Sequence, residues 1–213
     1  MTHDTRRTAH DSGNCEEIWA IILAAGESKR MGFPKMFLKF DGITMIEKVM
    51  TNVKMSQVDN AVVVLGSERE RLKELVEKTS FSHCYNDSFM DGMLSSVRCG
   101  FRHLTSNAAA VLIFQGDQPF IPAEVINQLI EAYRKSNKGI IIPVFNNKRG
   151  HPLLVANTYF KEVERLDPSD GLRGLAGRFP EDVLDLTTSE PGILRDLDTY
   201  EEYLEVINKN TEL

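Results

Sequence analysis

A small, polar and basic segment follows an apolar run near the start of the chain, and its residue types suit phosphate binding. The apolar run Ile18–Leu23 is long enough for one strand and does not alternate, which predicts burial on both faces. Glycines let backbone amides approach a ligand, a hydroxyl donates a hydrogen bond, and cations offset phosphate charge. The segment supplies all three kinds of group, in Gly26, Ser28, Lys29, Arg30, Gly32 and Lys35.

The same segment has a purely structural alternative, because any strand-to-helix turn can contain Gly and Lys. It lacks the G-x-G-x-x-G spacing of a dinucleotide-binding turn and the G-x-x-x-x-G-K-[ST] order of a P-loop. The missing glycine spacing argues against a Rossmann oxidoreductase. The residue types favour a phosphate-binding loop of another kind.

Asp117 is a second position that could do chemistry, since it follows an apolar strand predicted at Ala109–Gln115. The carboxyl ends of parallel strands meet at one edge of a sheet, so Asp117 is expected near the loop after Leu23. A carboxylate there suits Mg²⁺, which usually takes one or two carboxylates plus substrate phosphates. The alternative is a helix cap, but Asp117 lies five residues before Pro122, which is too far for a simple N-cap.

Apolar periodicity predicts the elements that position these residues. Strands are predicted at 18–23, 60–66, 82–85, 109–115, 139–144, 152–156 and 183–186, and the pair 139–144 and 152–156 suits a hairpin or an insertion. Helices are predicted around 43–53, 67–76 (with a capping box of Ser67 and Glu70), 93–104, 122–133 and 159–166, and from about 201. This alternation predicts an α/β fold: a three-layer, Rossmann-like, mostly parallel sheet with helices on both faces.

Composition limits the class of protein. The 213 residues suit one domain, expected over 15–213 after a disordered tail at 1–14. A net charge of −6 argues against nucleic acid and anionic membrane as partners. No apolar run approaches the roughly 18 residues of a membrane span, and the polar first residues do not form a signal peptide. Cys15, Cys84 and Cys99 have no C-x-x-C spacing, which suggests neither a zinc site nor a disulfide framework and fits a cytoplasmic location.

Several segments resemble nucleotidyltransferases that activate the molybdenum cofactor, within the nucleoside-diphospho-sugar transferase fold. LAAGESKRMGFPK at Leu23–Lys35 resembles the N-terminal signature of that family. GDQPFI resembles its GDMPFV-type segment, in which the aspartate, here Asp117, binds the metal. LRDLDT resembles its DIDTPED segment and implies a second acidic ligand, for which Asp196 and Asp198 are equal candidates. The N-cap of the last helix is the alternative role for Asp198.

The resemblance also implies roles for individual residues. Catalysis would use Arg30, Lys35 and Asp117. Nucleotide binding would use Leu23, Ala24, Ala25, Gly26, Ser28, Arg30, Lys35, Gly92, Ser95 and Gly116. Binding of the acceptor substrate would use Ser96, Arg98, His151 and Arg173, from the segments DSFMDGMLSSVRCGF, KRGHP and DGLR. Arg98 could instead be a solvated side chain, and His151 could be structural.

The implied activity is transfer of CMP from CTP to the phosphate of molybdopterin, with release of pyrophosphate and with Mg²⁺, or Mn²⁺ in its place, as cofactor. In this family LAAG goes with cytidine nucleotides and LAGG with guanosine, so Ala25 points to CTP. No general base is required, because the acceptor phosphate is already ionised near neutral pH. The alternatives are transfer to a sugar or polyol phosphate, and a non-catalytic accessory protein for a molybdenum hydroxylase.

Overall fold

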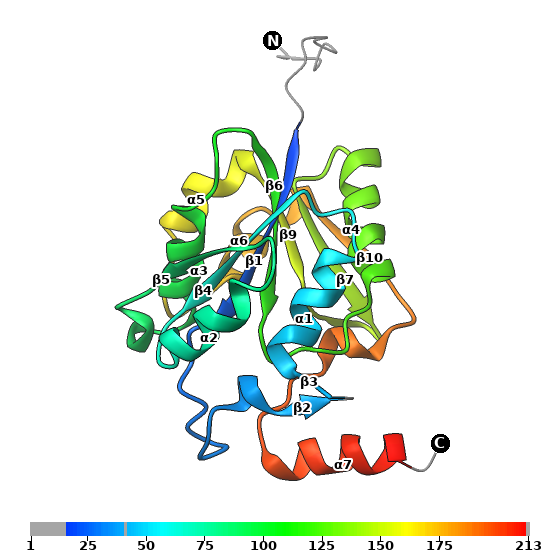
Figure 1. The fold of residues 1–213 in the computed structure, drawn as a ribbon. Helices are drawn as coiled ribbons and strands as arrows, with labels where there is room; N and C mark the ends of the chain where they lie inside the picture. The colour runs from blue at the N-terminus through cyan, green and yellow to red at the C-terminus, as the bar shows by residue number, and fades with distance from the viewer. Residues whose placement is uncertain (1–15, 41, 212–213) are drawn as a thin grey trace, which may run out of the picture.

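A sheet forms the middle layer of the molecule, and helices cover both of its faces (Figure 1). The computed structural model describes residues 16–40 and 42–211, so the tail expected at 1–14 lies outside the described residues. The strands are β1 (Glu17–Ala24), β2 (Lys39–Phe40), β3 (Ile43–Thr44), β4 (Asn60–Leu65), β5 (Ser82–Tyr85), β6 (Ala108–Gln115), β7 (Ile140–Phe145), β8 (Lys148–Arg149), β9 (Leu153–Ala156) and β10 (Val183–Thr187). The α-helices are α1 (Met45–Lys54), α2 (Arg69–Val76), α3 (Met93–Phe101), α4 (Ala123–Lys135), α5 (Phe160–Glu164), α6 (Arg173–Arg178) and α7 (Tyr200–Thr211).

The strand order places β1 at a switch point of the main sheet. The order is β10-β7-β9-β6-β1-β4-β5, and β1 pairs in parallel with both β4 and β6. The chain therefore runs outward from β1 to β5 and then returns to the other side of β1. Leu23 near the end of β1 lies opposite Gln115 at the end of β6. Open parallel sheets bind ligands beyond the carboxyl ends of strands at such a point.

The two strands expected at 139–144 and 152–156 correspond to β7 and β9. They pair antiparallel, and β9 lies between β6 and β7, antiparallel to both. β10 pairs in parallel with β7 at the sheet edge. The short strand β8 also pairs antiparallel with β7. The sheet is therefore mostly parallel, with β8 and β9 antiparallel, and the predicted fold class is confirmed.

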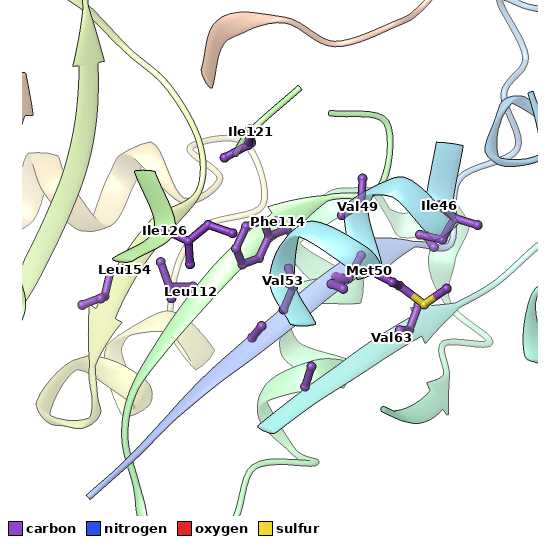
Figure 2. Packing of buried hydrophobic residues seen from close by; sticks show 14 of the residues in the cluster. Ile46, Val49, Met50, Val53, Val63, Leu112, Phe114, Ile121, Ile126 and Leu154 are labelled. Carbon is purple, nitrogen blue, oxygen red and sulfur yellow. The ribbon is translucent and has the colours of Figure 1, made fainter. Parts of the chain in front are cut away.

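Each face of the sheet packs on its own set of helices. On one face, Ile22, Val63 and Phe114 belong to a core shared with α1, α2 and α4, and Figure 2 shows Phe114 and Val63 beside residues of α1 and α4. On the other face, Ile21 and Ile113 pack with α3, α5 and α6. Full burial of one such side chain contributes about 1.5–3 kcal/mol. This two-sided burial explains why the central strands are continuous apolar runs.

The start of α1 differs from the expected helix. Thr44 is its N-cap and forms a capping box with Glu47, whose carboxylate accepts a hydrogen bond from the Thr44 amide at 2.8 Å. Ile43 therefore precedes the helix, in β3, and is not part of its apolar face.

The capping box predicted at Ser67 and Glu70 is wrong. The N-cap of α2 is Glu68, which makes no side-chain capping bond. Ser67 Oγ donates instead to the carbonyl of Gly26 at 2.9 Å. The serine thus ties the end of β4 to the loop after β1 and is not available to cap the helix.

Other helix boundaries shift by a few residues. α3 ends at Phe101, so Leu104 lies beyond it. Pro122 is the N-cap of α4 and lies just outside its first turn. None of the helices in the described ranges combines the length and apolar character that a bilayer crossing requires.

The C-terminal helix α7 lies at the carboxyl end of the sheet, beside β2 and β3 (Figure 1). Phe40, Met45, Leu197 and Val206 form a separate small core there. The ring of Tyr203 contacts that of Phe40 edge-on, with centroids 5.4 Å apart. This packing holds the segment before α7 at the end of the sheet where the predicted site residues emerge.

Candidate active site

A cleft of about 360 Å³ opens at the carboxyl ends of β1 and β6. Its walls come from the loop after β1, the short 3-10 helix η1 (Lys35–Phe37), the start of α3, the end of β6 and the segment before α7. Many of the residues predicted for catalysis, nucleotide, acceptor or metal binding line it, namely Leu23, Ala25, Gly26, Ser28, Arg30, Lys35, Gly92, Ser96, Asp117 and Asp198.

Close contacts fix the loop after β1. A Cβ at Gly66 would lie 2.4 Å from the carbonyl oxygen of Ala25, so only glycine fits where β4 meets this loop. The amide of Ser67 donates to the same carbonyl at 3.2 Å. Farther along, Ser28 Oγ accepts a hydrogen bond from the amide of Lys35 at 3.2 Å. Because Ser28 Oγ only accepts in this bond, its proton remains available for a phosphate oxygen.

Two cations and two carboxylates meet on one side of the cleft. Lys35 Nζ lies 2.5 Å from Asp117 Oδ2 and 2.9 Å from Asp198 Oδ1. Arg30 Nη1 lies 2.7 Å from Asp198 Oδ2. The Lys35 and Asp117 side chains are each 13% exposed, whereas that of Arg30 is 72% exposed at the rim. Three segments far apart in the sequence thus build one charged cluster.

The charges of this cluster stabilise one another. Burial acts to lower the pKa of Lys35, but attraction to Asp117 and hydrogen bonds to Asp117 and Asp198 outweigh it, so the pKa lies above its ordinary value. Burial acts to raise the pKa of Asp198, but its hydrogen bonds and ion pairs with Lys35 and Arg30 leave that pKa below its ordinary value. Lys35 is therefore protonated and Asp198 ionised at neutral pH.

The two carboxylates fit a divalent cation. Asp117 Oδ1 is buried and has no hydrogen-bond partner among the described residues, although buried carboxylate oxygens normally have one. Mg²⁺ binds oxygen ligands, usually one or two carboxylates together with substrate phosphates. Within residues 16–40 and 42–211, no cluster of three or more His, Cys, Asp or Glu could hold a metal ion. Asp117 and Asp198 are two carboxylates in the cleft lining that could hold such an ion, with a triphosphate supplying further oxygens.

Of the two aspartates predicted near the C-terminus, Asp198 lines the cleft, while Asp196 is exposed and is not among the lining residues. Asp196 still lies close enough to the cluster that burial and the negative charges of Asp198 and Asp117 raise its pKa. The start of α7 explains the difference. The Glu202 carboxylate accepts hydrogen bonds from the amides of Asp198 and Thr199, at 2.8 and 3.0 Å. Thr199 Oγ1 accepts from the Glu202 amide at 3.3 Å. Because Thr199 and Glu202 cap the helix, the Asp198 side chain remains free to contact Lys35.

Another wall of the cleft is the segment before α3 together with the first turn of that helix. Gly92, the N-cap of α3, has φ of 96°, a backbone conformation that suits glycine. Buried Asn86 donates from Nδ2 to Ser95 Oγ at 2.8 Å and to Ser96 Oγ at 2.9 Å. Ser96 lines the cleft, whereas Ser95 Oγ donates to the carbonyl of Ser88 and faces a neighbouring cleft. Of the two predicted serines, the structure brings Ser96 alone to this cleft.

Ala24 and Gly116, both predicted to bind nucleotide, are not among the residues that line the cleft. Ala24 is only 1% exposed, in the core. The amide of Gly116 donates to the carbonyl of Leu23 at 2.9 Å, and a Cβ at Gly116 would lie 2.9 Å from that same oxygen. Gly116 therefore allows β1 and β6 to end side by side, and Ala24 packs in the core.

Arg98 and Arg173, both predicted to contact the acceptor, are not among the lining residues of this cleft. Arg98 Nη2 donates to the carbonyl of Leu166 at 2.6 Å, which links α3 to the segment after α5. Arg173 is exposed at the first residue of α6. The sequence predicts that Arg98 lies on α3, but it does not determine in which direction the side chain of Arg98 points.

Gln115 lines the cleft and was not predicted, and neither were Met36, Phe89 and Met93. Gln115 Nε2 lies 2.8 Å from His151 Nε2. Burial lowers the pKa of His151, so the neutral ring accepts this hydrogen bond. His151 thus reaches the cleft through Gln115. The sequence did carry a signal for Gln115 as a site residue: it is a polar side chain at the end of an apolar strand, two residues before Asp117.

The structure has an α/β, nucleotide-diphospho-sugar transferase-like fold, which it shares with solved structures. The MobA-like NTP transferase domain matches residues 20–183, and the chain belongs to that family. Bifunctional protein GlmU of Clostridium kluyveri is 31% identical over 140 residues, which cover 64% of this chain and 30% of that protein. The chain thus spans about a third of the length of this curated relative.

Solved structures share the fold at low sequence identity. Rv0371c from Mycobacterium tuberculosis H37Rv superposes with a TM-score of 0.80 at 21% identity, over 90% of this chain and 98% of that one. The complex of the same protein with manganese superposes with a TM-score of 0.77 at 20% identity, over 90% of this chain and 98% of that one. Molybdopterin-guanine dinucleotide biosynthesis protein A from Archaeoglobus fulgidus gives 0.67 at 17%, over 92% and 100%. The 4-diphosphocytidyl-2C-methyl-D-erythritol synthase from Anaerococcus prevotii gives 0.73 at 18%, over 92% and 96%.

Proposed function

We propose that this protein is a metal-dependent nucleotidyltransferase that transfers CMP from CTP to the phosphate of a molybdopterin-type acceptor and releases pyrophosphate. The observation that carries the proposal is the meeting, in one cleft, of a small-residue loop with Lys35, Asp117 and Asp198. Membership of the MobA-like NTP transferase family supports nucleoside triphosphate as the donor.

In the proposed reaction, the loop at 25–28 and the Ser28 hydroxyl hold the triphosphate. Lys35 and Arg30 offset negative charge on the transferred group and on the leaving pyrophosphate, the usual role of such cations in phosphoryl transfer. Asp117 and Asp198 would hold Mg²⁺ or Mn²⁺, which when bound neutralises charge and orients the phosphates. The remaining requirement is to place the acceptor phosphate in line with the α-phosphorus.

The choice of CTP rests on Ala25, which lies in the cytidine-type LAAG sequence and lines the cleft. The choice of molybdopterin rests on the sequence resemblance and on the fold shared with the Archaeoglobus protein. For the acceptor side we propose Ser96, together with Gln115 held by His151. Arg98 and Arg173 lie outside the lining, and the proposal gives them no contact.

A sugar or polyol phosphate is the second candidate acceptor. The Anaerococcus protein with the same fold is named as a synthase of a diphosphocytidyl methylerythritol, which keeps the cytidine nucleotide and changes the acceptor. Both candidates use the same triphosphate and metal residues, so they differ only on the acceptor side of the cleft.

The test is pyrophosphate release with each of the four nucleoside triphosphates, with and without molybdopterin. We expect release with CTP and molybdopterin together, and its loss in Asp117→Asn. Release that requires a sugar or polyol phosphate would select the second candidate. Delivery of cofactor to a molybdenum hydroxylase without any triphosphate, and no release with verified acceptor, would refute the enzyme and favour an accessory role.

A further inference from the structure

Two cysteines on different elements have their side chains in contact. Cys84 is on β5 and Cys99 is on α3, fifteen positions later, and their Sγ atoms are 3.4 Å apart. Both are free thiols. Cys99 is 7% exposed, whereas Cys84 is half-buried and more accessible to a reagent.

The segment between these cysteines forms one wall of the cleft. It contains Gly92 and Ser96, which line the cleft, and Asn86, whose amide holds Ser96 in place. A covalent link between positions 84 and 99 would close a ring around this wall. Asn86 lies two residues after Cys84, and Ser96 lies three residues before Cys99, so both ends of the hydrogen bond are near the link.

We propose that Cys84 and Cys99 form a reversible disulfide whose closure distorts this wall and weakens binding in the cleft. A disulfide bond is about 2.05 Å long, so the two sulfur atoms must approach by roughly 1.4 Å. The approach draws the end of β5 toward α3. The Asn86–Ser96 hydrogen bond joins the residue that follows β5 to α3, so it must adjust.

Peroxide is the class of oxidant that this site would use. The sulfur of Cys84 attacks one oxygen of hydrogen peroxide, an S–O bond forms, the O–O bond breaks, and water leaves. The sulfur of Cys99 then attacks the sulfenic acid sulfur, an S–S bond forms, the S–O bond breaks, and a second water leaves. In total two thiols lose two electrons and two protons, and one peroxide becomes two waters.

The surroundings make this reaction slow and selective. Burial, together with the contact between its sulfur and that of Cys99, raises the pKa of the Cys84 thiol, and the nearby charge of Arg102 opposes the shift only in part. Because the thiolate is the reactive form, oxidation should be slower than that of a small exposed thiol such as glutathione. The contact with Cys99 then favours the internal disulfide over further oxidation.

The test uses the full chain carrying Cys15→Ser, so that Cys84 and Cys99 are its two remaining cysteines. After treatment with hydrogen peroxide and alkylation, mass spectrometry should show the peptides of positions 84 and 99 linked within one chain, at a mass lower by two hydrogens. Dithiothreitol should reverse the change. Thiols that remain alkylatable, sulfonic acids, or links between two chains would overturn the proposal.

A second measurement reads the effect on the cleft and rests on the proposed function. CTP should bind at least about fivefold more weakly to the oxidised chain and recover on reduction. The matched control carries Ser at positions 15, 84 and 99 and should not respond to peroxide. Amide hydrogen exchange over 86–96 reads the same wall without nucleotide and should differ between the two redox forms. Equal hydrogen exchange over 86–96 in the two redox forms would overturn the proposed effect of the disulfide on the cleft. A reduced chain that binds no triphosphate would instead refute the proposed function.

Discussion

The ammonium group of Lys35 lies 2.5 Å from the carboxylate of Asp117, although the two residues are 82 positions apart in the sequence. Both side chains are mostly buried, so neither charge is well solvated if its partner is removed. Asp198 completes the cluster from the C-terminal segment, 2.9 Å from the same ammonium group. The cleft therefore depends on three segments being folded together.

Replacement of Lys35 by Met keeps the length of the side chain and removes its charge. We expect Lys35→Met to lower the free energy of unfolding by about 3 kcal/mol in metal-free buffer, because Asp117 and Asp198 lose their buried cation. Mg²⁺ should restore part of the loss, since it would bind the same carboxylates. Urea unfolding with EDTA or with Mg²⁺ measures both effects.

Lys29→Met is the matched control for this experiment. Lys29 also lines the cleft, but its side chain is 72% exposed and pairs with Glu27. Its replacement should change the free energy of unfolding by less than about 0.5 kcal/mol. If Mg²⁺ stabilises the wild type and Lys35→Met equally, the metal does not share the carboxylates with Lys35.

Asp198 and Asp196 make a matched pair for the second metal ligand. We expect Asp198→Asn to lower kcat for pyrophosphate release by roughly 10²-fold or more, because charge stabilisation at the reacting phosphate is lost. Asp196→Asn should remain within about twofold of the wild type, since Asp196 is not among the residues that line the cleft. Steady-state kinetics of both variants decides the assignment, and a larger loss in Asp196→Asn would reverse it.

Gln115 should set the KM for the acceptor and have little effect on kcat. Gln115→Leu removes a polar group that His151 holds at the cleft, so we expect KM for the acceptor to rise about 3–10-fold. The KM for the triphosphate should stay nearly constant. A rise in the triphosphate KM alone would place Gln115 on the nucleotide side.

The capping box of α1 gives a dependence of stability on pH. Hydrogen bonds from the Thr44 side chain and backbone hold the pKa of Glu47 below its ordinary value. Ionised Glu47 therefore contributes to the free energy of unfolding. This contribution is fully present above the pKa of the residue in the unfolded chain, about 4.3, and is lost as pH falls through its lower pKa in the folded protein. Glu47→Gln should flatten the acid limb of the free energy of unfolding measured against pH.

Thr44→Ala should lower the free energy of unfolding by about 1 kcal/mol at neutral pH, because α1 loses its N-cap. The control is Glu70→Gln on α2, where the sequence pattern predicts a capping box that the structure lacks. It should leave the acid limb unchanged. A pH response in Glu70→Gln as large as that in Glu47→Gln would contradict this assignment of the caps.

The sequence predicted those parts of the site that depend on strand ends. Ile18–Leu23 and Ala109–Gln115 are apolar because both faces of the sheet are covered, and topology then brings Asp117 to the loop that contains Ser28. These inferences need only the positions of the strands and their parallel order.

Features that depend on side-chain direction could not be predicted in the same way. Spacing alone could not separate Asp196 from Asp198, because the difference arises from the caps that Thr199 and Glu202 provide. The contact of Cys84 with Cys99 likewise requires β5 and α3 to be packed together. The local pattern also failed at Ser67, which bonds to a distant loop.

The most direct test of the account is the effect of Mg²⁺ on triphosphate affinity, measured by calorimetry for the wild type and for Asp117→Asn. If the loop after β1 and the carboxylate of Asp117 act on one metal-bound nucleotide, Mg²⁺ will tighten binding to the wild type, and Asp117→Asn will lose most of that gain while retaining its metal-free affinity. An equal gain from Mg²⁺ in both proteins would contradict the account.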